Sequence, residues 1–138
     1  AINSHGTKLL LEPLGKGDSD YLHTLEDARR VLNQVGCQEL GLHFDAKAMA
    51  EAGEISEQTV REYAPQAMHC HVNEMDLGAL KADSPVNHDA LGRSLREGGY
   101  TGWISLEQHM VNQHDFMPPL RQSMSVLMKS YQHGESRI

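Results

Sequence analysis

The chain has 138 residues and carries 19 acidic against 12 basic side chains, which gives a formal net charge of -7. This length suits one ordinary domain, and an acidic domain repels the phosphates of nucleic acid and of anionic lipid, so we expect neither as a partner. Only two cysteines are present and no apolar run approaches the ~20 residues of a membrane span, so a reducing, cytoplasmic location is expected.

The first predicted strand is the apolar run KLLLE, which ends at Glu12. A helix is expected after it, because Thr24 can cap a segment in which Leu25 and Leu32 recur at helical spacing. Gly36 is the predicted end of that helix, since glycine readily adopts the left-handed conformation at a helix C-terminus.

The second and third predicted strands are LGLHFD, which ends at Asp45, and AMHCHV, which contains His71. Between them, Ser56 can cap a helix that closes before Pro65. Asn87 can cap the helix that follows the third strand. The unit of strand, loop and helix therefore repeats along the chain.

The fourth predicted strand is WISLE, which ends at Glu107. The last helix is predicted to begin near Pro118 and to run to Tyr131, because proline is favoured in the first turn of a helix. Met124 and Met128 lie on an apolar stripe of this helix and are expected in the core.

Strands that alternate with helices predict a parallel sheet, in either an open or a closed form. Residue parity favours the closed form, because one face of each strand is apolar and the other mixes polar and apolar groups, as a barrel interior does. The mixed face is predicted to carry Glu12, His43, Asp45, His69, His71 and Glu107. The apolar face is predicted to carry Leu9, Leu11, Leu42, Phe44, Met68, Cys70, Ile104 and Leu106. The expected fold is thus α/β of the (β/α)8 TIM-barrel type, with about four of the eight units in a chain about half the ~250 residues of a full barrel.

The polar residues at the four strand ends predict a cation site, because chemistry in such folds lies at the carboxyl ends of the strands. Glu12, Asp45, His71 and Glu107 offer three carboxylates and one imidazole. This donor set favours Mn²⁺, with Mg²⁺, Co²⁺ or Zn²⁺ as alternatives. The alternative interpretation is that these side chains cap the following helices or face solvent.

The runs LLLEPL, GLHFDAKAM, HCHVNEMD and LREGGYTGWISLE, in this order, resemble the second half of the xylose isomerase-like TIM barrels, a group of sugar isomerases and epimerases that includes tagatose 3-epimerase-like enzymes. The resemblance covers residues 8 to 108, and it implies that residues 1–138 are a single C-terminal half-barrel. In that family the residues that match Glu12, Asp45, His71 and Glu107 hold one divalent ion, and the two glutamates are also acid and base.

The function that this resemblance implies is a metal-dependent isomerase or epimerase of a sugar or sugar phosphate. Its reaction would pass through an enediolate, with Glu12 and Glu107 as the proton carriers. Glu74 and His109 are predicted to contact the substrate.

Several alternatives remain open at the level of sequence. The same scaffold supports lyases of the inosose dehydratase type, and a half-barrel without its complement would be catalytically inactive. DNA-repair endonucleases share the barrel, but the charge of -7 argues against that function.

The chain departs from the epimerases at Ala48, where many have His, and at Leu77, where many have Arg. A half-barrel also has exposed edges, so we expect either a fragment of a longer enzyme or a chain that associates with itself or with an N-terminal half.

Overall fold

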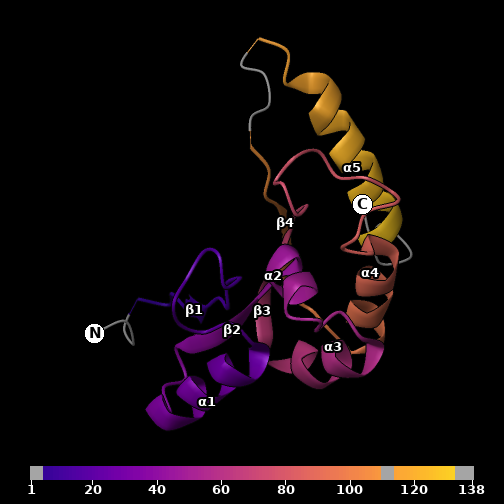
Figure 1. Ribbon diagram of the computed structural model, residues 1–138. Coiled ribbons are helices and arrows are strands. Elements are labelled where there is room, and N and C mark those ends of the chain that lie inside the picture. Colours follow the sequence, from indigo (N-terminus) through magenta and orange to yellow (C-terminus); the bar gives the residue numbers. More distant parts are fainter. Residues whose placement is uncertain (1–4, 110–113, 133–138) are drawn as a thin grey trace.

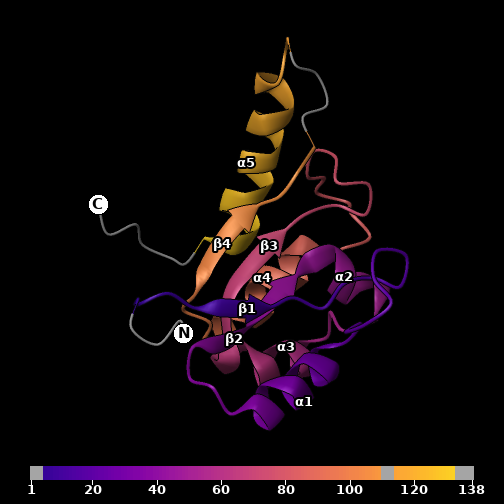
Figure 2. The ribbon, with the colours of Figure 1, turned by 90° about the vertical axis from the view of Figure 1, so that its left-hand side faces the viewer.

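A sheet of parallel strands, with helices on one side, forms the described part of the chain, which is residues 5–109 and 114–132 of a computed structural model (Figures 1 and 2). The strands are β1 (Leu9–Leu11), β2 (Leu40–Asp45), β3 (Ala67–Val72) and β4 (Trp103–Leu106). The helices are α1 (Leu25–Val35), α2 (Ala46–Glu51), α3 (Glu57–Tyr63), α4 (His88–Glu97) and α5 (Met117–Tyr131), with a 3-10 turn η1 (Ala64–Gln66) before β3.

The strands lie in chain order, β1-β2-β3-β4, and every neighbouring pair is parallel. In the register, Asp45 pairs with His71 and His71 pairs with Ser105, so these residues form one row across the sheet. His43 and His69 pair in the row beneath. The predicted alternation of parallel strands with helices is confirmed.

Local capping explains where three of the helices begin and why α1 ends. Thr24, Ser56 and Asn87 each accept a hydrogen bond from the backbone N–H three residues later, at the first turns of α1, α3 and α4. Gly36 ends α1 in the left-handed region, with φ of 59°. These signals involve only neighbours in sequence, which is why they could be read in advance.

The short helix α2 was not predicted. It begins directly after β2 without a loop, and Asp45 is its N-cap, accepting a 2.8 Å hydrogen bond from Ala48 N through Oδ1. The sequence offered no separate cap signal, because the last residue of the strand is itself the cap.

The predicted apolar face of the sheet is covered by helices, and Leu42, Phe44 and Cys70 are fully buried there. The placement of Met68 on that face was wrong. Leu42 pairs with Ala67 and His43 pairs with His69, so Met68 is an extra residue in β3 and forms a bulge that interrupts the alternation. Its sulfur lies 2.6 Å from the Cβ position of Gly41, on the opposite face.

The prediction that Met124 and Met128 lie in the core was also wrong, because their side chains are 41% and 46% exposed. The buried positions of α5 are Ser123, Ser130 and Tyr131. Helix α5 packs on α4 through these residues, and the polar groups among them are hydrogen-bonded to α4 and to the loop before it.

Gly92 permits the close approach of α4 and α5. A Cβ atom at this position would lie 2.0 Å from the backbone oxygen of Ser130. We therefore expect Gly92→Ala to lower the free energy of unfolding by about 1–3 kcal/mol, since a backbone oxygen cannot rotate away. Urea denaturation followed by circular dichroism measures this. Gly17→Ala is the matched control, because nothing lies within 4 Å of its Cβ position. An equal effect of the two substitutions would contradict the steric explanation.

Among the described residues, no helix combines the length and the apolar character that crossing a membrane requires. Both cysteines are free thiols. Cys70 is buried, and burial raises the pKa of its thiol well above the usual range, which makes it an inert packing group.

Candidate metal centre

Side chains from all four strands converge at one end of the helix-free face. Ligand atoms of Glu12, Asp45 and His71 lie within 4.8 Å of one another. His71 Nδ1 is 3.1 Å from Glu12 Oε1 and 3.6 Å from Glu107 Oε2. All four residues of the predicted cation site therefore gather around the imidazole of His71. Asp45 is buried, Glu12 and His71 are partly buried, and Glu107 is exposed.

Asn73 holds this arrangement together, and sequence reasoning missed it. Its Nδ2 donates to Asp45 Oδ2 at 2.7 Å and to Glu107 Oε2 at 2.8 Å, while its Oδ1 accepts from Lys47 N at 2.8 Å. The side chain is 1% exposed. A signal for it existed, since Asn73 lies two residues after His71 and so shares its face of the strand.

Two carboxylates of the site, those of Glu12 and Asp45, are withdrawn from solvent, and all three lie close to one another. Burial raises the pKa of Glu12, and the charges of Asp45 and Glu107 raise it further, whereas His71 lowers it. Burial also raises the pKa of Asp45, against the hydrogen bonds from Ala48 N and Asn73. The protein itself supplies too little positive charge to balance these carboxylates, and a divalent cation between them would offset their negative charge.

Two further imidazoles lie in the next row of the sheet, those of His43 and His69. Burial, together with the charges of the neighbouring His71 and His69, lowers the pKa of His43 to about 3. Burial and His71 also lower the pKa of His69, whose Nε2 lies 2.8 Å from Ser105 Oγ. Both rings are accordingly neutral at physiological pH, with a lone pair on one nitrogen.

Glu74 was predicted to contact substrate, but its carboxylate is turned into the protein and is 1% exposed. It accepts hydrogen bonds from Lys81 N at 2.7 Å and from Ser84 Oγ, and it lies 3.3 Å from His88 Nε2. These contacts organise the loop between β3 and α4. In the described structure Glu74 is not among the residues that gather around His71.

His109, the second residue predicted to contact substrate, is exposed beyond the end of β4. Its backbone N–H donates to Leu77 O at 2.7 Å, which ties together the loops that follow β3 and β4. A role for its side chain in binding stays a prediction.

A cavity of about 170 Å³ adjoins the cluster on the side of Asp45, Asn73 and Glu107. Its other lining residues are Leu14, Gly15, Asp18, Lys47, Ala48 and Leu77. A second cavity of about 510 Å³, on the other side of Gly15 and Ala48, is lined by residues that include Lys16, His23 and Glu51. The smaller cavity provides space directly beside the carboxylates of Asp45 and Glu107.

Comparison with known proteins gives a family and a fold. Residues 1–130 match the family model described as xylose isomerase-like TIM barrel. No curated protein sequence is significantly similar to the chain.

Solved structures superpose on most of the chain. An L-ribulose 3-epimerase matches with a TM-score of 0.82 at 18% identity, covering 94% of this chain and 48% of that one. A 3-keto-D-glucoside 4-epimerase from E. coli matches with a TM-score of 0.81 at 22% identity, with coverages of 93% and 48%. An AP endonuclease of family 2 from Brucella melitensis matches with a TM-score of 0.73 at 15% identity, with coverages of 96% and 49%. The chain thus spans about half the length of these structures and forms a partial barrel.

Proposed function

The chain belongs to the xylose isomerase-like TIM-barrel family, and on that basis we propose that it acts as a sugar or sugar-phosphate isomerase or epimerase. The observation that carries this proposal is the pair of glutamates from the first and last strands, which both approach His71. The solved relatives named as ribulose, psicose and keto-glucoside epimerases support the same class of reaction.

Glu12, Asp45, His71 and Glu107 are the residues that would hold a divalent cation. They fit such an ion because three carboxylates crowd around one imidazole, with burial raising the pKa of two of them. Hard oxygen donors favour Mn²⁺, with Mg²⁺, Co²⁺ or Zn²⁺ as alternatives. When bound, the cation would stabilise negative charge on the oxygens of a ketose.

The two glutamates would move the proton. Because Glu12 follows β1 and Glu107 follows β4, they are attached at opposite edges of the sheet and can reach a bound sugar from two sides. One carboxylate removes the proton next to the carbonyl and the other returns a proton to the opposite face, which inverts that carbon. Return to the neighbouring carbon would give aldose-ketose isomerisation instead. Asn73 would hold the Glu107 carboxylate through its hydrogen bond.

The substrate is expected to differ from those of the epimerases that this chain resembles. Ala48 and Leu77, the two positions at which it departs from them, both line the cavity beside Asp45 and Glu107. A small and an apolar side chain there replace an imidazole and a guanidinium, so fewer hydrogen-bond donors are available to sugar hydroxyls. His109 remains a candidate contact at the mouth.

A lyase of the inosose dehydratase type is the second candidate, because the same proton removal precedes loss of a β-hydroxyl. Product analysis separates it from an epimerase. An endonuclease is disfavoured, since the net charge of -7 repels a phosphate backbone. We also propose a cytoplasmic location.

We further propose that the chain, as the C-terminal half of a barrel, pairs with a second copy or with an N-terminal half. Both outer strands carry exposed apolar side chains, Leu9 at 56% and Trp103 at 80%. Such edges favour pairing with another chain. Without that complement the half-barrel would bind metal and be catalytically poor.

Asp45→Asn tests the centre while keeping the fold, because asparagine is an equally good helix N-cap. We expect its Mn²⁺ affinity, measured by calorimetry, to fall at least about tenfold. Loss of a residue that only supports a metal ligand already lowers affinity by about that factor, and loss of the ligand itself should lower it at least as much. The wild-type chain with Mn²⁺ should also incorporate solvent deuterium from D2O into a ketose such as D-fructose, D-tagatose or L-ribulose, followed by NMR.

Unchanged Mn²⁺ affinity in Asp45→Asn would show that Asp45 is only a helix cap. Deuterium incorporation should be lost in Asp45→Asn together with the ion. Mn²⁺ binding without incorporation into any ketose of a broad panel would support the inactive half-barrel instead of the enzyme.

A further inference from the structure

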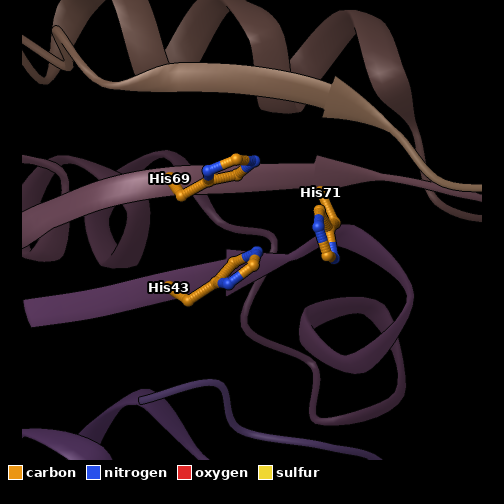
Figure 3. Close-up of side chains that lie close together, drawn as sticks. All are labelled: His43, His69 and His71. Carbon is orange, nitrogen blue, oxygen red and sulfur yellow. The ribbon is translucent and has the colours of Figure 1, made fainter. Parts of the chain in front are cut away.

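Three imidazoles form a second group of nitrogen donors next to the carboxylates. The ring centroids of His43 and His71 are 4.2 Å apart, those of His43 and His69 4.9 Å, and those of His69 and His71 5.3 Å. Figure 3 shows the three rings rising from two neighbouring strands toward the same space. One ligand nitrogen from each residue lies within 4.8 Å of those of the other two.

His43 contributes an observation that packing alone does not explain. Its Nε2 is a buried side-chain nitrogen with no hydrogen-bond partner among the described residues. The nearest acid, Glu12, has Oε1 3.6 Å away, which is too long for a hydrogen bond. Buried polar atoms are nearly always satisfied, and an unsatisfied one marks a missing water, ion or function. A metal ion between the three rings would satisfy this nitrogen.

His69 is oriented by a contact of the kind that supports metal-bound histidines. Its Nε2 lies 2.8 Å from Ser105 Oγ, and such a bond fixes the ring and leaves the second nitrogen for a ligand. His71 already lies beside the carboxylates. The cluster therefore combines the unpartnered nitrogen of His43, the ring of His69 oriented by Ser105, and the ring of His71, which also belongs to the carboxylate set.

We propose that His43, His69 and His71 form a nitrogen-rich site for a late first-row divalent cation such as Zn²⁺, distinct from the carboxylate set that would hold Mn²⁺. Imidazole suits Zn²⁺, and three protein ligands with one open position are a known zinc arrangement. Zn–N bonds are about 2.0–2.1 Å, so the rings must draw together by side-chain rotation from their present spacing. Because His71 belongs to both sets, the two ions compete for it.

This inference does not depend on the sugar chemistry. It concerns which ion the chain selects, and it holds or fails on the binding of metal alone. Two substitutions should therefore discriminate between the ions: His43→Gln acts on the imidazole set, whereas Glu107→Gln acts on the carboxylate set.

The experiment is calorimetric titration of the chain with Zn²⁺ and, separately, with Mn²⁺. In His43→Gln we expect the Zn²⁺ dissociation constant to rise at least about tenfold while that of Mn²⁺ changes by less than about threefold, because a zinc ligand is lost and the manganese ligands remain. Glu107→Gln should show the reverse pattern. His71→Gln should weaken both ions. The chain has nine histidines, so only this difference between variants identifies the site.

Three outcomes would overturn the proposal: Zn²⁺ affinity unchanged in His43→Gln, Zn²⁺ affinity lowered by Glu107→Gln as much as by His43→Gln, or Mn²⁺ affinity lowered by His43→Gln as much as Zn²⁺. Circular dichroism checks that each variant is folded, and His69→Gln replaces His43→Gln if the latter is not. Zn²⁺ binding that depends on His43 without any Mn²⁺ binding would support this site and count against the proposed enzyme. Mn²⁺ binding together with a Zn²⁺ affinity that does not depend on His43 would support the proposed enzyme and count against this site.

Discussion

Replacing Glu12 by Gln is expected to stop deuterium incorporation into one of two epimeric ketoses while the other still exchanges. If Glu12 and Glu107 serve opposite faces of the sugar, each removes the proton from only one epimer. The glutamine keeps the size of the side chain but cannot accept a proton, and the exchange rate of the affected epimer should fall by about 10²- to 10⁴-fold. Saturating Mn²⁺ must be present, since Glu12 is also a proposed ligand.

Glu107→Gln is the matched variant and should stop exchange of the other epimer. Net interconversion should be lost in both variants, because converting either epimer into the other requires one glutamate to remove the proton and the other glutamate to return it. Proton NMR in D2O measures the rate at the carbon next to the carbonyl. If either substitution abolished exchange of both epimers with Mn²⁺ still bound, one carboxylate would be the sole base, and the two-face mechanism would be wrong.

Glu74→Ala is expected to lower the free energy of unfolding by about 3 kcal/mol, the upper end of the cost of leaving a buried hydrogen-bond donor without its acceptor. The carboxylate accepts from Lys81 N and Ser84 Oγ and lies beside His88 Nε2. Burial lowers the pKa of His88, so its ring is neutral, with Nε2–H toward Glu74 and Nδ1 accepting from the Tyr131 hydroxyl at 2.7 Å. Removing Glu74 therefore leaves the buried Nε2–H of His88 and the partly buried donors of Lys81 and Ser84 without their acceptor.

Thermal and urea unfolding measure the effect, and Asp83→Ala is the control because Asp83 is an exposed acid in the same loop. Glu74→Gln should recover part of the stability, since its amide oxygen can still accept from Lys81 N. A stable Glu74→Ala variant with altered sugar affinity would instead support the role in substrate contact that the sequence suggested.

The arrangement of the site could largely be predicted because it follows from strand parity. Glu12, Asp45 and His71 lie at the ends of parallel strands, and alternation of side chains near those ends fixes which face they share. The helix caps at Thr24 and Ser56 were equally accessible, since each depends on a hydrogen bond within one turn.

Features that depend on contacts distant in sequence could not be predicted in this way. The bulge at Met68 is a property of the register between β2 and β3. The burial of Glu74 requires the loop to return so that His88 and Ser84 face it. Both oxygens of Asp45 already accept hydrogen bonds, Oδ1 from Ala48 N in α2 and Oδ2 from Asn73 Nδ2, and the second of these contacts was not predicted.

The sequential strand order has a consequence for modularity. All of the donor side chains, in both proposed ion sites, come from these four neighbouring strands, and none has to be supplied across the open edges at β1 and β4. The unit could therefore be recombined with different complementary halves, each bringing its own walls to the pocket, while the ion-binding chemistry is inherited intact. Substrate range and metal chemistry would then be free to evolve separately.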